Sequence, residues 1–236
     1  MKPLQVLGIC GSPRKGNSLF LLERALQAAR KGATGVEVDS VSLGGRKLAA
    51  CNSCFWCVTH KGECKVQDDF QELRAKWLQS QVILYSFPVY HMGIPGQLKC
   101  FIDRLGQSGG YIYETRVRRL KVIGAITQGK HLYGGQDVAL SFIVQHAVLM
   151  RCLPVSGEGG ISYIGAGGWA FDLREIHAMR DHYEGGDPYA KITVEAAESI
   201  GRRAVELAEI IRSGGIAQKE KLAKDPAYLP FLKELE

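Results

Sequence analysis

Short apolar runs alternate with stretches of helical periodicity along most of the chain. The run at residues 82–87 shows no regular apolar–polar alternation, which is typical of a strand buried on both faces. Leu19, Leu22, Leu26 and Ala29 instead recur at spacings of three, four and three, which marks one face of a helix. The expected strands cover residues 4–9, 36–43, 82–87, 122–127 and 153–155. The expected helices begin near residues 18, 68, 97, 137 and 192.

This order of elements predicts an α/β fold. Strands that alternate with helices form a parallel sheet through right-handed crossovers, with helices on both faces. Residues 156–190 interrupt the pattern because they are rich in glycine. We expect a long irregular loop there, which in a compact domain is usually functional or interfacial. The charged tail at residues 219–236 is expected to be only partly ordered.

The composition is that of a soluble globular protein. The 236 residues are 46% hydrophobic and 23% charged, which is too hydrophobic for a disordered chain. No apolar stretch approaches the roughly 18–20 residues of a membrane helix, and the first residues lack a signal-peptide core. A cytoplasmic protein without membrane contact is therefore expected. The net charge of +6 is modest and dispersed, so it does not indicate nucleic-acid binding.

The loop at residues 11–18, between the first strand and the first helix, has the features of an anion site. Its position places backbone N–H groups and the positive end of a helix where an anion can bind. Asn17 stands where a P-loop requires lysine, and no G-x-G-x-x-G follows the strand, so both nucleotide fingerprints are missing. Ser12, Asn17 and Ser18 can donate to a phosphate monoester, and Arg14 can neutralise it. The same residues also fit a plain turn in which Asn17 or Ser18 caps the helix.

Four of the seven cysteines crowd into one segment with the spacing C-x2-C-x2-C-x6-C, namely Cys51, Cys54, Cys57 and Cys64. An odd total in a chain expected to stay in the cytoplasm argues for metal or redox chemistry and against a disulfide framework. Three cysteines at two-residue spacing suit a cubane cluster, whereas zinc sites normally use two separated pairs. The spacing favours a [4Fe–4S] cluster and leaves zinc or redox-active thiols as alternatives. Cys10, Cys100 and Cys152 lie among apolar residues and are expected in the core.

Three segments together resemble the flavodoxin-like NAD(P)H-dependent FMN reductases. Residues 11–18 resemble the phosphate loop of that family, residues 88–104 resemble the segment that flanks the isoalloxazine ring, and residues 127–136 resemble the third flavin loop. The segments follow the first, third and fourth strands, where a ligand binds an open five-stranded parallel sheet of order 2-1-3-4-5. The resemblance covers about residues 4–155. It implies that FMN is bound by Ser12, Arg14, Gly16, Asn17, Ser18, Pro88, Val89, Tyr90, His91, Met92, Gly93, Thr127, Gln128, Gly129, Gly134, Gly135 and Gln136.

The cysteine segment also resembles the iron–sulfur flavoproteins of the same superfamily, in which a short four-cysteine motif holds a [4Fe–4S] cluster beside FMN. The resemblance implies that Cys51, Cys54, Cys57 and Cys64 are the cluster ligands. It implies an electron-transfer oxidoreductase that takes electrons from ferredoxin or NAD(P)H, requires no proton-transfer residue, and forms a homodimer or homotetramer. The cluster of one subunit is then expected near the flavin of another.

The order of elements, together with this resemblance, predicts how the chain is organised. One FMN-binding domain is expected over residues 1–190, with the cysteine loop inserted at 44–66 and the glycine-rich loop at 156–190. A C-terminal helix and tail at 191–236 are expected to pack on that domain. Four aromatic residues of the glycine-rich loop are expected against another subunit or the flavin edge, namely Tyr163, Trp169, Phe171 and Tyr183.

Two other functions fit parts of the pattern. One is an NAD(P)H-dependent FMN or quinone reductase without a cluster, whose cysteines hold zinc or nothing. The other is an FMN-binding redox sensor that does not turn over. Iron and sulfide content separates the first from a cluster-bearing enzyme. Rapid bleaching of bound flavin by NAD(P)H or reduced ferredoxin argues against the second.

Overall fold

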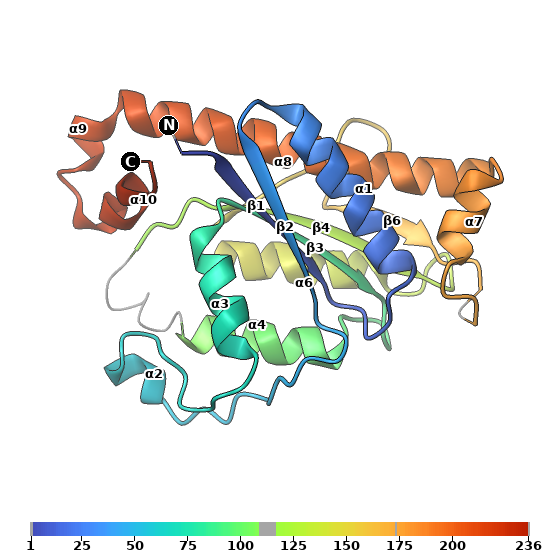
Figure 1. The fold of residues 1–236 in the computed structure, drawn as a ribbon, viewed down its shortest axis with the longest axis horizontal. Helices are drawn as coiled ribbons and strands as arrows, with labels where there is room; N and C mark the ends of the chain where they lie inside the picture. Colours follow the sequence, from blue (N-terminus) through green and yellow to red (C-terminus); the bar gives the residue numbers. More distant parts are fainter. Residues whose placement is uncertain (1, 109–116, 173, 236) are drawn as a thin grey trace.

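A computed structural model describes residues 2–108, 117–172 and 174–235 of the chain (Figure 1). Its centre is a sheet in the order β2-β1-β3-β4-β5, and every pairing between the named strands is parallel. The predicted fold class and strand order are confirmed. The strands are β1 (Leu4–Cys10), β2 (Val36–Ser42), β3 (Val82–Pro88), β4 (Val122–Gly129), β5 (Leu153–Pro154) and β6 (Ala166–Trp169).

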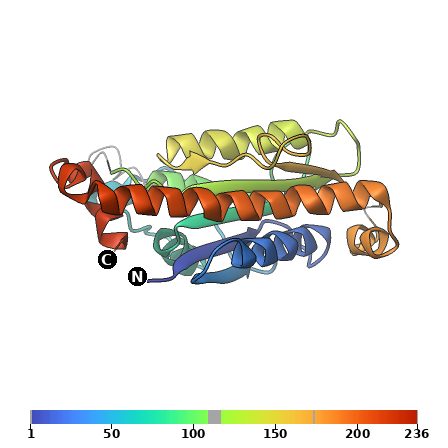
Figure 2. The ribbon, with the colours of Figure 1, turned by 90° about the horizontal axis from the view of Figure 1, so that it is seen from above.

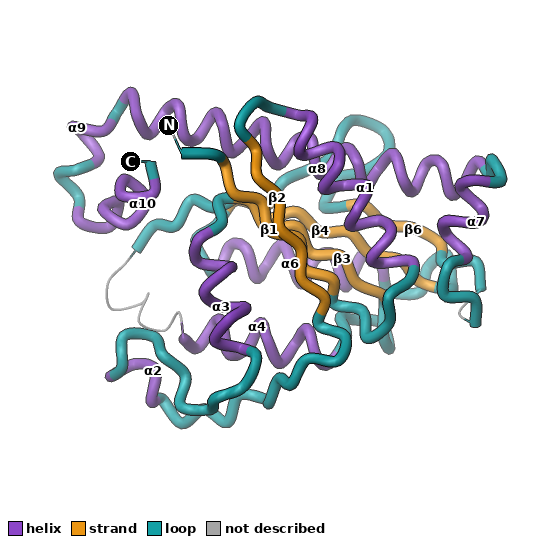
Figure 3. The backbone as a smooth tube through the Cα atoms, in the orientation of Figure 1, coloured by secondary structure: helices purple, strands orange, loops and turns teal. Residues whose placement is uncertain are grey.

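The two faces of the sheet carry two separate cores. Along β3, Val82 and Leu84 belong to one core, whereas Ile83 and Tyr85 belong to the other. The first core is covered by α1 (Asn17–Gly32) and α8 (Pro188–Ala217), and the second by α3 (Phe70–Gln79), α4 (Gly96–Ser108) and α6 (Gln136–Leu149). Figure 2 shows α8 running along most of the length of the molecule, and Figure 3 shows helices on either side of the strands.

The glycine-rich segment is not the irregular loop that its composition predicts. It contains β6, which pairs with β4 beside the two-residue β5, and α7 (Ala178–Glu184), so the sheet has a sixth strand. A Cβ atom on Gly168 of β6 would lie 2.3 Å from Thr193 Cγ2 of α8. Glycine is therefore present because a helix packs directly on this strand.

The C-terminal part is also more ordered than its charge predicts. α8 begins at Pro188, because the Asp187 carboxylate accepts from Tyr189 N and Ala190 N at 2.9 Å each. The tail forms α9 (Lys219–Leu222), a 3-10 turn η1 (Pro226–Tyr228) and α10 (Leu229–Glu234). The buried ammonium of Lys121 ties α10 to the start of β4 by contacting Glu234 at 3.2 Å. Among the described helices, none is both long and apolar enough to cross a membrane.

Candidate functional site

An open cleft of about 410 Å³, the sheet-end cleft, lies where β1, β3 and β4 end. This is the edge at which open parallel sheets bind ligands, and the volume is within the usual range of small-molecule sites. The cleft is lined by Ser12, Arg14, Gly16, Asn17, Ser18, Pro88, Val89, Tyr90, His91, Gln128, Gly129, Asp172 and Ile176. All three predicted segments therefore contribute to one site.

The first loop leaves the N-terminus of α1 open to the cleft. Gly16 occupies the N-cap position, and none of the described side chains caps the helix, so the alternative of a cap by Asn17 or Ser18 is wrong. Asn17 Oδ1 instead accepts from Met179 N at 3.0 Å, and Ser12 Oγ accepts from Arg14 N at 3.1 Å. Uncapped N–H groups at the positive end of a helix suit an anion.

Two cleft residues come from the glycine-rich segment and were missed by the sequence reasoning. They are Asp172 and Ile176. A Cβ atom on Gly16 would lie 2.2 Å from Ile176 O, so the segment touches the loop at residues 11–18. Gly16 was predicted as a ligand-contacting residue, but its lack of a side chain also admits this backbone. The only sign of this contact in the sequence was the glycine at position 16, whose packing role no local pattern explained.

The second loop turns back on itself at the rim of the cleft. Tyr90 and Gly93 pair through backbone hydrogen bonds of 2.9 and 3.0 Å, and His91 and Met92 between them both have positive φ, 45° and 66°. Tight turns of this kind usually contain Asn and Gly, so two larger residues here store local strain, which is common at functional sites. Tyr90 remains 45% exposed, so its ring is free to stack on a ligand. Met92 and Gly93 do not line the cleft.

The third loop divides into lining and supporting residues. Gln128 Nε2 donates to Ser18 Oγ at 3.1 Å, whereas Gln128 Oε1 is buried and has no partner among the described residues. A buried acceptor without a donor is costly, which marks this residue of the cleft as incompletely satisfied. Thr127 and Gln136 are bonded behind the cleft, to Phe87 O at 2.8 Å and His131 O at 2.6 Å. Thr127, Gly134, Gly135 and Gln136 therefore lie outside the lining.

The four clustered cysteines line a second pocket, the cysteine pocket, which lies against the last turns of α4 and beside the short helix α2 (Trp56–Thr59). Its lining includes Cys51, Cys54, Cys57, Cys64 and Arg104. All four thiols are free, and Cys57 Sγ donates to Gln107 O at 3.2 Å. Burial raises the pKa of the Cys57 thiol, and the charges of Cys64, Cys51 and Cys54 raise it further. In the described parts of the chain, no three His, Cys, Asp or Glu side chains are grouped closely enough to hold a metal ion.

The three remaining cysteines are placed differently. Cys10 and Cys152 are buried in the two cores, as expected, and burial raises the pKa of Cys152 to about 12. Cys100, in α4, is only half-buried. None of the three lines the cysteine pocket, which separates them from the clustered set.

The backbone of the cysteine loop has an unusual local conformation. Ser53 and Phe55, which flank Cys54, have positive φ values of 52° and 55°. A left-handed residue beside a right-handed one can turn successive N–H groups toward one point, a geometry found at phosphate and iron–sulfur sites. Phe55 lines the pocket but is 63% exposed, and Trp56, which is 39% exposed, does not line it, so these aromatics do not seal the pocket.

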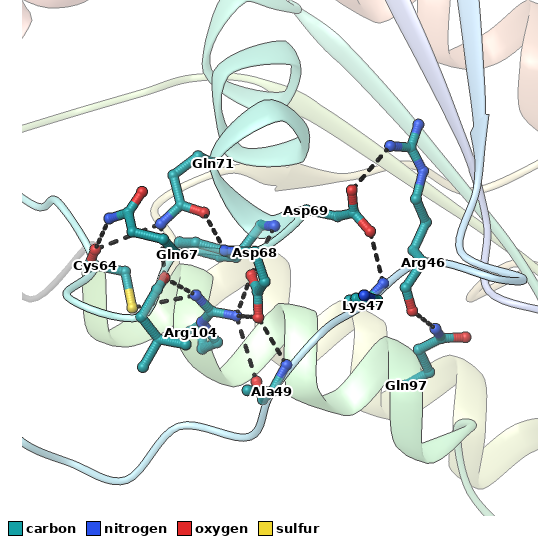
Figure 4. Close-up of polar contacts among 12 residues, drawn as sticks. Arg46, Lys47, Ala49, Cys64, Gln67, Asp68, Asp69, Gln71, Gln97 and Arg104 are labelled. Atoms are coloured by element: carbon teal, nitrogen blue, oxygen red, sulfur yellow. Dashed lines mark hydrogen bonds and ion pairs between the residues drawn. The ribbon is translucent and has the colours of Figure 1, made fainter.

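Two carboxylates at the start of α3 hold the entrance to the cysteine loop (Figure 4). Asp69 accepts from Lys47 N at 2.6 Å, and Asp68 accepts from Ala49 N at 2.9 Å. Asp68 also forms an ion pair with the buried Arg104 at 2.6 Å. Burial tends to raise the pKa of Asp68, but the bonds from Ala49 N and Arg104 outweigh it, so its pKa lies below the usual value.

Helix α4 connects the two sites. It begins directly after the second loop of the sheet-end cleft, and its last turns carry Arg104, Gln107 and Ser108 of the cysteine pocket. Its 13 residues span roughly 20 Å at 1.5 Å per residue. The two pockets of one chain therefore lie near opposite ends of this helix.

The strand order 2-1-3-4-5, with a ligand cleft at the carboxyl ends of β1, β3 and β4, defines a flavodoxin-like α/β protein. Residues 4–163 match the family described as NADPH-dependent FMN reductase. An iron–sulfur flavoprotein of Archaeoglobus fulgidus is 32% identical over 195 residues, which cover 83% of this chain and 96% of that protein. Another, from Methanocaldococcus jannaschii, is 28% identical over 89% of this chain and all of the relative.

A solved structure of RosB with a bound 8-demethyl-8-formylriboflavin 5′-phosphate intermediate has the same fold. Its TM-score is 0.64 at 14% identity, and the match covers 92% of this chain and 86% of that one. The chain belongs to the NADPH-dependent FMN reductase family and, within it, to the iron–sulfur flavoproteins. It is a flavin-dependent oxidoreductase.

Proposed function

We propose that this chain is an electron-transfer oxidoreductase that binds FMN in the sheet-end cleft and a [4Fe–4S] cluster in the cysteine pocket. The observation that carries the proposal is that all four clustered cysteines line one pocket, separate from the cleft. FMN exchanges one or two electrons and a cubane cluster exchanges one, so together they connect donors and acceptors of different kinds. The protein supplies position and potential.

In the cleft, the proposed binding follows the chemistry of each part of FMN. The N-terminus of α1, with Ser12 and Arg14, suits the phosphate. The buried oxygen of Gln128 suits a hydroxyl of the ribityl chain. The exposed ring of Tyr90 suits the isoalloxazine face. Met92, Gly93, Thr127, Gly134, Gly135 and Gln136 are proposed to shape the loops instead of contacting FMN.

In the cysteine pocket, the proposed ligands are Cys51, Cys54, Cys57 and Cys64. Four free thiols that line one pocket on one compact loop are the ligand chemistry of a cluster, although no three of these described side chains are grouped closely enough to hold a single metal ion. Asp68 and His60 are poor substitutes for a lost cysteine. Asp68 is bonded to Arg104, and the His60 ring stacks on Trp56 with centroids 3.5 Å apart.

The proposed electron donors are ferredoxin or NAD(P)H, and the proposed assembly is a homodimer or homotetramer. The length of α4 between the two pockets supports a subunit arrangement in which the cluster of one chain approaches the flavin of another. Large apolar side chains that are open to solvent in the single chain support it as well. Tyr133 is 96%, Tyr163 74% and Leu132 70% exposed.

The test is anaerobic purification followed by a visible spectrum and assays of iron, acid-labile sulfide and flavin. The proposal expects about four irons and four sulfides per chain beside one FMN, identified by mass after heat release. Flavin that is FAD, or iron that is absent after anaerobic reconstitution, would contradict it.

An alternative is an NAD(P)H-dependent FMN or quinone reductase without a cluster, which the description of the matched family favours. Its cysteines would hold zinc or no metal. This alternative expects a yellow protein with flavin bands alone, one zinc or none, and bleaching by NAD(P)H.

A further inference from the structure

A buried guanidinium, that of Arg104, borders the cysteine pocket. The residue is 2% exposed and belongs to α4. Its Nη1 donates to both oxygens of Asp68 at 2.7 and 2.6 Å. Its Nη2 donates to Cys64 Sγ at 3.3 Å and to Val66 O at 2.7 Å (Figure 4). One side chain therefore contacts a carboxylate, the backbone after Cys64 and a proposed ligand sulfur.

Arg104 is not fully satisfied by these contacts. Its Nε is buried and has no hydrogen-bond partner among the described residues. Leaving a buried donor unpaired is costly, and more so for a charged group. Negative charge in the neighbouring pocket would offset part of this cost. A cluster with four thiolate ligands carries such charge.

We propose that Arg104 is a redox-tuning residue, which raises the reduction potential of the cluster through its positive charge and its hydrogen bond to Cys64. This inference rests on the proposed function. When the cluster gains one electron, its net charge becomes more negative by one unit. A cation and an N–H donor at a ligand sulfur stabilise the reduced state more than the oxidised state. The carboxylate of Asp68 acts in the opposite direction, because its negative charge disfavours the added electron.

The chain offers a matched control in Arg74 of α3. This second guanidinium is near the same loop, since a Cβ atom on Gly62 would lie 2.7 Å from Arg74 Nη2. Its Nε donates to Ser108 Oγ at 3.2 Å, and the contacts described for it include no ligand sulfur. Arg74→Gln removes a charge near the pocket without removing a bond to sulfur.

The experiment is an anaerobic redox titration of the full-length holoprotein with dithionite. The reduced cluster is followed by electron paramagnetic resonance, and the flavin by absorbance as an internal reference. Arg104→Gln is expected to disfavour reduction of the cluster about tenfold, a shift of about 59 mV to lower potential for a one-electron couple. Arg104→Lys is expected to lower the cluster potential by less than Arg104→Gln does. Arg74→Gln is also expected to shift the cluster potential by less than Arg104→Gln. Asp68→Asn raises the potential.

The cluster potential is expected to shift in opposite directions in the Arg104→Gln and Asp68→Asn variants. This distinguishes redox tuning from a purely structural role, in which the Arg104–Asp68 pair only holds the loop in place (a clamp). A clamp would lose iron in both variants and would not move their potentials in opposite directions. Unchanged cluster potential in Arg104→Gln with full iron content, or a lower potential in Asp68→Asn, overturns the inference. Loss of iron in Arg104→Gln, Arg104→Lys and Asp68→Asn alike overturns it as well. Absence of iron and sulfide in the wild-type protein instead overturns the proposed function.

Discussion

At the scale of single residues, burial decides which titratable groups keep their ordinary chemistry. His146, on α6, is 5% exposed, and burial lowers its pKa to about 4. Its Nε2 lies 3.4 Å from the hydroxyl of Tyr85, which accepts from Trp77 Nε1 at 2.9 Å. The Tyr85 hydroxyl is then left to donate to a neutral imidazole. A protonated His146 cannot accept this bond.

This burial predicts a stability loss at acidic pH. The folded-state pKa of about 4 lies below the ordinary value of 6.5, so between these values the unfolded state binds more protons and folding loses stability as pH falls. The loss from this residue is about 3 kcal/mol across the window. His146→Gln should lower stability near neutral pH but remove most of this slope. Denaturant melts at pH 7, 5.5 and 4 measure it, and an unchanged slope in the variant would contradict the assignment.

The phosphate loop provides a second prediction at this scale. Combining Ser12→Ala with Arg14→Ala should weaken FMN binding by about 3 kcal/mol, because hydrogen bonds to a charged group contribute roughly 1.5–3 kcal/mol each. Fluorescence titration of the apoprotein with FMN measures the loss. Lys15→Ala is the matched control, since Lys15 is exposed on the same loop but does not line the cleft. Equal losses in the control and the double variant would count against a specific phosphate site.

At the scale of elements, periodicity predicted the sheet and most helices, but not the glycine-rich segment. Apolar runs identify buried strands because both faces of a parallel sheet are covered. β6 is too short and too rich in glycine to show such a run, and its pairing with β4 depends on the packing of α8. The start of α8 at Pro188, not near 192, was readable from Asp187 followed by proline.

The candidate site, like the fold, was predictable from the sequence only in part. The loops after β1, β3 and β4 were predicted because loops at this sheet edge are adjacent in any fold of this strand order. Which residues point into the cleft was not predictable, since Thr127 and Gln136 bond to the backbone behind it. Asp172 and Ile176 also line the cleft, but they belong to the glycine-rich segment, which is distant in sequence. No local sequence pattern predicts that this segment folds against the cleft.

The cap of α8 gives a prediction at the scale of elements. Asp187→Ala removes the carboxylate that accepts from Tyr189 N and Ala190 N, and should lower the free energy of unfolding by about 1 kcal/mol. Glu195→Ala is the control, because this residue is exposed further along the same helix and should change stability by less than about 0.5 kcal/mol. Urea denaturation compares the two, and equal effects would contradict the capping role.

At the scale of the whole molecule, one helix relates two separate pockets. α4 starts at the sheet-end cleft and ends at the cysteine pocket, so the proposed flavin and cluster of one chain lie far apart. Some aromatic side chains of the glycine-rich segment are partly buried by contacts within the same chain. Phe171 stacks on His182 with ring centroids 3.9 Å apart, and Tyr183 packs against the α1–α8 core, whereas Tyr163 stays exposed.

This arrangement predicts self-association. Sedimentation equilibrium of the holoprotein at micromolar concentration should give a dimer or a tetramer, because assembly covers exposed apolar residues and can bring cluster and flavin of different chains together. A stable monomer whose flavin is rapidly reduced through its own cluster would contradict the intersubunit arrangement.

The central claim, that one chain holds both FMN and a four-cysteine cluster, is tested most directly by iron and sulfide content across a cysteine series. Each single Cys→Ser change at Cys51, Cys54, Cys57 or Cys64 should lower bound iron sharply and bleach the broad cluster absorbance while FMN remains bound. Serine at Cys10, Cys100 or Cys152 should leave iron content unchanged, because these residues lie outside the cysteine pocket. Full iron and sulfide in Cys64→Ser would show that the fourth ligand lies elsewhere and would contradict the account.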